Sequence, residues 1–156
     1  MKRVRLWMIG IGLFIAVGLL TVKPGYAEEP TCTLKTMKGR YLFAQRSTLL
    51  PPAFGVTEPT PATAAGIQLF NGDGAGTVIF TFHIGGATVL ENAERPVSYT
   101  VEANCTGSLT VLLSESEELT FGLFIAPSGD SIAHIATAPL GNEVSETSWR
   151  VSRQLH

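Results

Sequence analysis

Two histidines are the residues best suited to acid–base or metal chemistry in the body of this chain. They are His83 and His134, and the third histidine, His156, is the last residue. No metal-ligand spacing surrounds either of them, so the sequence predicts no metal site. His134 alternates with Ile132 and Ala136, which places it on the inner side of a predicted strand. We expect a hydrogen-bonded core histidine there, with titration near neutral pH as its functional use.

The run Asn71-Gly72-Asp73-Gly74 is a second candidate for chemistry. Asn and Asp at alternate positions can begin a calcium loop, but Phe82 stands where the distal glutamate would be needed. The same four residues favour positive φ and therefore predict a hairpin turn. The chain also has no GxSxG nucleophile motif and no phosphate-binding glycine loop. No catalytic residue and no cofactor follow from motifs of these kinds.

The N-terminus has the three parts of a secretion signal. A cationic start is followed by an apolar run over residues 6–22 and by the small residues Gly25 and Ala27. We expect a signal helix over 1–27, cleavage after Ala27, and one folded domain over 28–156 in a secreted or periplasmic protein. The alternative is an uncleaved anchor, because the apolar run is near the ~17 to 25 residues that span a bilayer.

The two cysteines, Cys32 and Cys105, predict one structural disulfide. An even count in an exported chain is most simply a bridge, and the CxxC spacing of a redox pair is missing. The bridge would close a loop of 74 residues. For a loop of that size the chain-entropy model gives a stabilisation of about 4 kcal/mol.

The mature chain is acidic and has the size of one domain. Removing the first 27 of 156 residues leaves 129, and it leaves 7 of the 11 basic residues against all 13 acidic ones. A chain of this length can bury a real core. An acidic surface without a basic stripe argues against nucleic acid and anionic membranes as partners.

Hydrophobic alternation predicts an all-β domain. Runs rich in β-branched and aromatic residues are separated by Gly, Asn, Asp and Pro. We expect strands over 39–46, 65–70, 75–83, 96–102, 107–113, 118–126, 130–137 and 147–153. Short connections predict antiparallel neighbours, and about eight strands favour a single up-and-down barrel, since closure removes exposed edges. A two-sheet sandwich is the alternative, and residues 51–64 are expected to form a long irregular loop.

The more apolar face of each predicted strand is assigned to the barrel interior. By this rule Ile67 and Leu69 face inward, as do Trp149 and Val151 on the last strand. A barrel of eight strands is either filled by side chains or holds one small ligand. The interior aromatic residues and one histidine are the expected ligand-binding set: Tyr41, Phe43, Phe80, Phe82, Tyr99, Phe121, His134 and Trp149.

Four runs of the mature chain stand out together. They are Gly39-Arg40-Tyr41, LFNGDGAGT at 69–77, YTVEANCTGSLT at 99–110 and IAHIAT at 132–137. In this order and spacing they resemble a set of exported bacterial proteins, mostly uncharacterised, with the patterns GxY, FDGDGxGT, YxVxxDCTGxxT and IxxIxT. Asn71 and Asn104 depart from that pattern, which usually has Asp at both positions.

The resemblance implies a small β-barrel similar to the calycins and to the barrel of allene oxide cyclase. Such barrels host carriers, isomerases and structural domains, so the likeness implies an architecture and no activity. In the calycins a late arginine closes the barrel against the first strand. Arg150 and Arg153, near the end of the last strand, are expected to do the same here.

Three classes of function follow from these observations. The leading hypothesis is a non-enzymatic barrel that holds a small apolar molecule at its mouth beneath the 51–64 loop, with Tyr41 and Tyr99 supplying hydroxyls. Ligand pockets are typically ~300 Å³, and an interior with less than about 100 Å³ of free space would contradict this hypothesis. The second hypothesis is a cyclase or isomerase in which His134, Glu102 or Tyr99 handles a proton beside an open cavity.

The third hypothesis is a structural or surface-interaction module. It requires a filled barrel and a contiguous apolar patch on the outer face. The outer residues expected to form such a patch are Leu112, Phe124 and Ile135.

Overall fold

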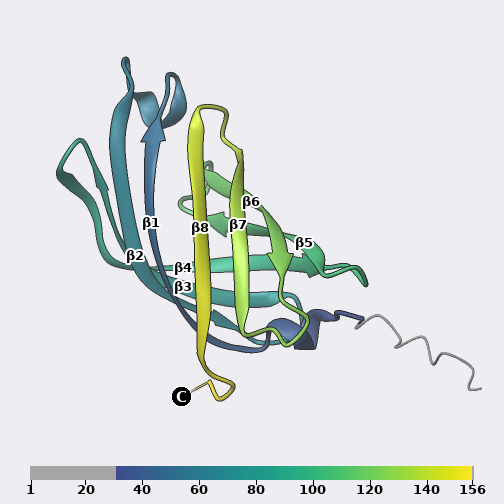
Figure 1. The fold of residues 1–156 in the computed structure, drawn as a ribbon. Helices are drawn as coiled ribbons and strands as arrows, with labels where there is room; N and C mark the ends of the chain where they lie inside the picture. Colours follow the sequence, from purple (N-terminus) through teal and green to yellow (C-terminus); the bar gives the residue numbers. More distant parts are fainter. Residues whose placement is uncertain (1–30, 156) are drawn as a thin grey trace, which may run out of the picture.

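The computed structural model describes residues 31–155, which form a closed antiparallel barrel of eight strands (Figure 1). The strands are β1 (Gly39–Leu49), β2 (Thr60–Phe70), β3 (Ala75–Ile84), β4 (Ala87–Val101), β5 (Thr106–Leu112), β6 (Glu118–Ile125), β7 (Ser131–Ala138) and β8 (Asn142–Ser152). Each strand pairs with its neighbours in sequence, and β1 pairs with β8. The predicted up-and-down barrel is confirmed, and the sandwich alternative is wrong. The predicted signal over 1–27 lies outside the described residues.

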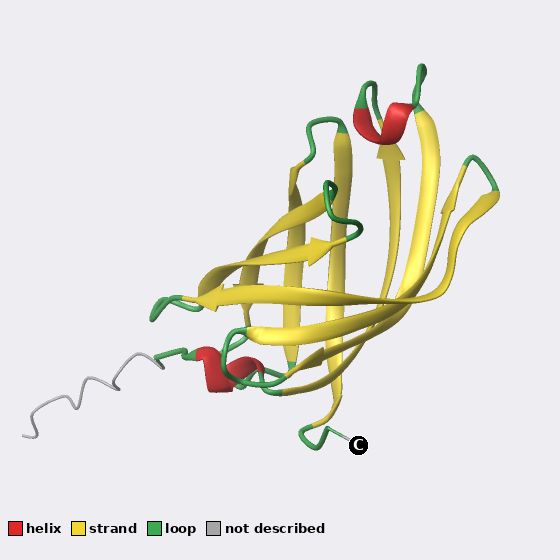
Figure 2. Cartoon of the chain, turned by 180° about the vertical axis from the view of Figure 1, so that it is seen from behind, coloured by secondary structure: helices red, strands yellow, loops and turns green. Residues whose placement is uncertain are grey.

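The connections alternate between the two ends of the barrel because neighbouring strands are antiparallel. Two short 3₁₀ helices, η1 (Leu34–Met37) and η2 (Ala53–Gly55), lie at opposite ends (Figure 2). We call the end with η1 and the β2–β3, β4–β5 and β6–β7 turns the closed end. The end with η2, which belongs to the β1–β2 connection, is the mouth.

Three aromatic side chains fill the closed end. Tyr41, Phe70 and Tyr99 pack edge to face, with ring centroids 5.4 and 5.0 Å apart. The Tyr99 hydroxyl accepts a hydrogen bond of 2.8 Å from the Gly72 amide in the β2–β3 turn. Met37 of η1 is also fully buried. Tyr41 and Phe70 are fully buried and Tyr99 is nearly so, so the protein's own side chains occupy this end of the barrel.

Arg150 on β8 joins η1 and the β6–β7 turn to β1. Its guanidinium donates to the Tyr41 hydroxyl at 3.0 and 2.7 Å, to the Ser128 carbonyl at 3.1 Å and to the Thr36 carbonyl. Tyr41 in turn donates to the Gly129 carbonyl at 2.6 Å. The late arginine that closes the barrel against the first strand is therefore Arg150.

The predicted disulfide is confirmed, because Cys32 and Cys105 are bonded with an S–S distance of 1.99 Å. It joins the segment before η1 to the β4–β5 turn, where the Cys32 amide also donates to the Ala103 carbonyl at 3.1 Å. The bridge is compatible with an oxidising, exported compartment. Within residues 31–155, none of the helices has the length and apolar character needed to cross a membrane.

Three strands begin earlier than predicted. β2 starts at Thr60, inside the expected loop, while β4 starts at Ala87 and β8 at Asn142. In the barrel Ala62 pairs with Ile84, and Leu49 pairs with Asn142. These extensions lack strong apolar alternation, so their pairing with neighbouring strands, and not local propensity, keeps them extended.

The inward face of β2 is the opposite of the predicted one. Gln68 and Phe70 are buried, whereas Ile67 and Leu69 lie on the outer face and are half-buried. Ile67 pairs with the exposed Leu42 of β1, which fixes its side of the sheet. The pleat of the neighbouring strand sets the orientation and overrides the local apolar pattern.

The inward face of β8 was also predicted wrongly. Trp149 and Val151 are 55% and 52% exposed on the outer surface, while Glu146 and Ser148 are buried. Trp149 pairs with Leu42, the same outward residue of β1 that orients β2. Two strands that flank β1 therefore turn polar side chains into the barrel, where the apolar-inside rule fails.

The β3–β4 hairpin reaches beyond β5 at the mouth. β5 pairs with β4 only from Val97 to Val101, so residues 87–96 pair with β3 alone. Figure 1 shows this teal hairpin extending to the left, away from β5. The barrel wall is therefore lower between β4 and the β5–β6 turn than elsewhere.

Candidate functional site

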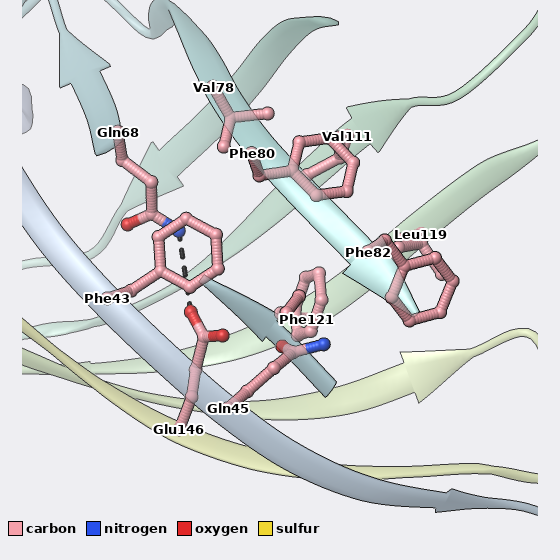
Figure 3. Close-up of a pocket in the computed structure, with 11 residues that line it drawn as sticks. Phe43, Gln45, Gln68, Val78, Phe80, Phe82, Val111, Leu119, Phe121 and Glu146 are labelled. Atoms are coloured by element: carbon pink, nitrogen blue, oxygen red, sulfur yellow. Dashed lines mark hydrogen bonds between the residues drawn. The ribbon is translucent and has the colours of Figure 1, made fainter. Parts of the chain in front are cut away.

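A small cavity of about 30 Å³ lies inside the barrel (Figure 3). It is lined by Phe43, Gln45, Ala64, Gln68, Val78, Phe80, Phe82, Val111, Leu119, Phe121 and Glu146. The space suffices for a water-sized group and is far smaller than the ~300 Å³ of ligand pockets. It also falls below the limit of about 100 Å³ given above, so a ready-made ligand pocket in the interior is contradicted, and a ligand could enter only after side chains move. In this structure the barrel interior is therefore filled by its own side chains.

A larger hollow of about 300 Å³ lies at the mouth, where the barrel wall is low. Its lining residues are Phe54, Phe82, Ile84, Val89, Leu90, Leu113 and Glu117. Phe82 lines this hollow and the inner cavity alike, so its side chain is part of the partition between them. The Phe54 ring of η2 packs edge to face on Phe82, with centroids 5.8 Å apart. Phe82 therefore stands between the mouth and the interior.

Four buried polar side chains form a hydrogen-bond relay that ends at the cavity. His134 Nε2 lies 3.0 Å from Ser148 Oγ, which donates to Gln68 Oε1 at 3.0 Å. Gln68 Nε2 then donates to Glu146 Oε1 at 3.4 Å, the contact drawn in Figure 3. The Ser148 hydroxyl has one proton and gives it to Gln68, so it accepts from His134 Nε2–H. All three hydrogen bonds of the relay therefore point toward the Glu146 carboxyl.

Because the ring proton of His134 is on Nε2, its Nδ1 atom is an unprotonated hydrogen-bond acceptor. Within residues 31–155 it is the one buried side-chain nitrogen or oxygen without a hydrogen-bond partner. Glu146 Oε1 lies 3.7 Å from it, which is too long for a hydrogen bond. The relay therefore has no hydrogen bond between His134 Nδ1 and Glu146 Oε1.

Burial sets the protonation of both ionisable members of the relay. It lowers the pKa of His134 to about 4, because the apolar interior disfavours the imidazolium. It raises the pKa of Glu146 to about 7, while the hydrogen bond from Gln68 acts in the opposite direction. Below neutral pH the relay consequently carries no charge, with Glu146 protonated and His134 neutral down to about pH 4.

Glu146→Gln is expected to change the pH dependence of stability. Between about pH 4.5 and pH 7 native Glu146 retains a proton that the unfolded chain releases, so stability falls as pH rises through this window. The glutamine of the variant does not titrate, so its stability does not fall for this reason. Relative to wild type, it should gain up to about 3 kcal/mol on going from about pH 4.5 to about pH 8, measured by denaturant unfolding.

The histidine contributes in the opposite sense. Between about pH 4 and pH 6.5 the unfolded chain binds a proton at His134 that the native protein does not, so stability falls as pH drops through that window. Wild type and Glu146→Gln share this histidine effect. The difference between their stability–pH profiles therefore reports on Glu146 alone. Glu143→Gln, on the exposed face of the same strand, is the control and should follow wild type within about 0.5 kcal/mol. Parallel pH profiles for wild type and Glu146→Gln would contradict the raised pKa.

Ser148, His134 and Glu146 are the residue types of a hydrolytic triad, but they have neither its hydrogen bonds nor its access. Ser148 is fully buried, does not line the cavity and has its proton engaged by Gln68. A nucleophile must reach the substrate, so these residues do not form a hydrolase site. In the part of the chain that the structure describes, Glu146 is the only ionisable side chain that lines the cavity.

Four of the eight residues expected to bind a ligand line the inner cavity: Phe43, Phe80, Phe82 and Phe121. Tyr41 and Tyr99 instead fill the closed end, so the expectation that their hydroxyls serve a pocket is wrong. Trp149 is also misplaced, because it lies on the outer surface. His134 faces inward as expected but lies in the relay, one step removed from the cavity wall.

Sequence reasoning missed Gln45, Gln68 and Glu146, the polar part of the cavity wall. A usable signal was present for Gln45, which continues the inward series of Tyr41 and Phe43 on β1. Gln68 and Glu146 could be placed only with the pairing to β1 in hand.

Other sequence candidates lie away from the cavity. Glu102 is exposed beside the β4–β5 turn, and residues 71–74 form the β2–β3 hairpin turn. The expected outer patch is not contiguous, because Leu112 ends β5 at the mouth whereas Phe124 pairs with Thr106 at its other end. These positions add nothing to the cavity.

Comparison with known proteins gives no further assignment. No protein-family model matches this chain, and no curated protein is significantly similar to it. The geometry of the cavity, the mouth hollow and the relay is therefore the basis for a functional proposal.

Proposed function

We propose that this protein binds a small, largely apolar molecule inside the barrel, admitted from the mouth when Phe82 turns aside. The observation that carries the proposal is the shared wall: Phe82 lines both the inner cavity of about 30 Å³ and the mouth hollow of about 300 Å³. With the ring displaced the two spaces would join. The joined space has the ~300 Å³ size of a ligand pocket.

The neighbours of Phe82 support such a movement. It pairs with Ala64 of β2, and Ala62 is the next inward residue on that strand. Methyl side chains leave room beside a phenyl ring that larger residues would fill. The inner wall of β2 is therefore the side on which a moving ring would meet the least bulk.

The backbone of Phe54 supports a mobile cover at the mouth. Its φ of 50° lies in the left-handed region, which costs a residue other than glycine on the order of 1 to 3 kcal/mol. A rearrangement of η2 that carries Phe54 away from Phe82 and returns its φ to a negative value would release this strain. Part of the cost of uncovering the hollow is thus offset within η2.

We further propose that the mature chain is exported and belongs to the calycin-like barrels. The disulfide supports an oxidising compartment. The Gly39-Arg40-Tyr41 run, the adjoining η1 and the Arg150 contacts support the calycin-like architecture. Neither point assigns a ligand.

Phe82→Ala is expected to raise the affinity for an apolar probe by about tenfold or more, because the ring no longer has to be displaced. Toluene is the probe, added to the mature, oxidised protein and followed by amide NMR shifts. The variant should lose about 3 kcal/mol of stability from its cavity, and toluene should restore part of it. Shifts are expected at Ala64 and Phe121, which line the cavity.

Phe70→Ala is the matched control, since it removes a fully buried phenyl ring at the closed end. It should be destabilised to a similar degree, and any toluene shifts should appear near Tyr99 and not at the cavity. Absence of toluene shifts at the cavity in both wild type and Phe82→Ala would overturn the proposal.

A second candidate function is a proton-transfer enzyme of cyclase or isomerase type. One observation favours it: Glu146, with its raised pKa, lines the cavity. Glu102 and Tyr99 no longer enter this hypothesis, because neither lines the cavity. Recovery of a bound molecule unchanged after long incubation would favour the carrier over the enzyme.

A further inference from the structure

The polar wall of the cavity ends in a carboxyl group with one free position. Glu146 Oε1 accepts from Gln68, and no other atom within residues 31–155 forms a hydrogen bond with this carboxyl group. Figure 3 shows the group reaching toward the Gln68 amide at the edge of the space enclosed by the phenylalanine rings. Oε1 thus accepts the hydrogen bond from Gln68, and the other carboxyl oxygen is available to bind a ligand.

The oxygen of Glu146 that does not accept from Gln68 is available to donate toward the cavity when the carboxyl is protonated. Each hydrogen bond from His134 through Ser148 and Gln68 is donated toward Glu146. Hydrogen bonds aligned in this way polarise one another and strengthen the donation by Gln68, which favours the ionised carboxyl, whereas burial acts in the opposite direction and raises the pKa of Glu146 to about 7. A proton on this carboxyl sits on the oxygen that does not accept from Gln68, and His134 Nδ1 forms no hydrogen bond with the group.

Among residues 31–155, no cation faces this carboxyl from the elements around it. β1 presents Gln45, β2 presents Gln68 and β7 presents His134, of which only the histidine titrates. Its pKa of about 4 keeps it neutral at physiological pH. A negatively charged ligand group placed here would be buried without a counter-charge, which is strongly unfavourable.

We propose that the protonated Glu146 carboxyl is the specificity-determining group of the cavity, donating a hydrogen bond to the carbonyl oxygen of an uncharged ligand. The inference rests on the proposed function and names its ligand class: small ketones and aldehydes with an apolar body, in preference to the corresponding carboxylates. The phenylalanine rings hold the apolar body. Glu146 holds the oxygen.

Three probes of similar size test the assignment on the mature, oxidised protein: toluene, acetophenone and benzoate. Near pH 6 acetophenone should bind about tenfold more tightly than toluene, because it gains one hydrogen bond in a dry site. Benzoate should bind at least about 100-fold more weakly than acetophenone, because its charge is buried unpaired. Affinities are measured from amide NMR shifts at the cavity residues.

The pH dependence gives a second readout. Acetophenone affinity should fall by about tenfold between about pH 6 and about pH 9, since Glu146 loses its proton near pH 7 and His134 does not titrate in this range. Toluene affinity should change much less. Glu146→Gln, which keeps a neutral donor, should bind acetophenone without this pH dependence, and Glu146→Leu should bind it no better than toluene.

The failures of the two proposals are distinguishable. Benzoate binding as tight as that of acetophenone, or pH-independent acetophenone binding to wild type, would overturn the role of Glu146 while toluene binding upheld the proposed function. If none of the three probes reaches the cavity in wild type or in Phe82→Ala, both proposals fail.

Discussion

Replacement of Arg150 by methionine is expected to lower the free energy of unfolding by about 3 to 5 kcal/mol. The guanidinium is nearly buried and joins η1, the β6–β7 turn and Tyr41 through several charge-assisted hydrogen bonds. Methionine fills much of the volume but leaves the Thr36 carbonyl without this donor. The loss is measured by denaturant unfolding of the oxidised protein.

Two further variants separate the several hydrogen-bond donors of the Arg150 guanidinium from its positive charge. Arg150→Lys should lose nearly as much stability as the methionine variant, because one ammonium cannot serve partners in several directions. Arg153→Met is the matched control: its side chain is 70% exposed and lies 3.7 Å from Asp130. It should change stability by less than about 1 kcal/mol. Equal losses for Arg150→Met and Arg153→Met would refute a structural role for the buried network.

Replacement of both cysteines by alanine is expected to cost about 4 kcal/mol of stability. The bridge joins residues 73 positions apart and limits the unfolded chain accordingly. It also holds the segment before η1 against the β4–β5 turn. Thermal and denaturant unfolding of the double variant and of oxidised wild type measure the difference.

Chemical reduction of wild type supplies an independent check on the cysteine variant. Reduced wild type should unfold at nearly the same denaturant concentration as the double alanine variant, since both lack the same constraint. A double variant as stable as the oxidised protein would show that the bridge contributes little to this barrel.

The barrel was predictable because its local signals agree with one another. Period-two alternation marked β3, β5, β6 and β7, while Gly72 and Gly74 marked the β2–β3 turn. Closure and neighbour pairing then followed from the short connections. The early parts of β2, β4 and β8 were missed because long-range pairing, and not composition, holds them extended.

The cavity was predictable only in its apolar half. Phe80 and Phe121 obey the rule that apolar side chains face inward, so they were assigned to the interior. Gln68 and Glu146 break that rule on two strands whose outer faces carry Ile67 and Trp149. A rule that assigns the more apolar face of each strand to the interior places both residues outside, so it misses them.

The low wall beside β4 has a consequence for how this protein meets other copies of itself. Along residues 87–96, in the part of the barrel that the structure describes, β4 has a backbone edge that β5 does not pair. A free edge of this kind can accept a strand from another molecule and start aggregation. Exposed Glu91 and Glu94, the irregular backbone at Asn92 and the missing amide hydrogen of Pro96 all oppose such strand addition. The unpaired edge of β4 beside the mouth hollow therefore has residues that oppose self-association.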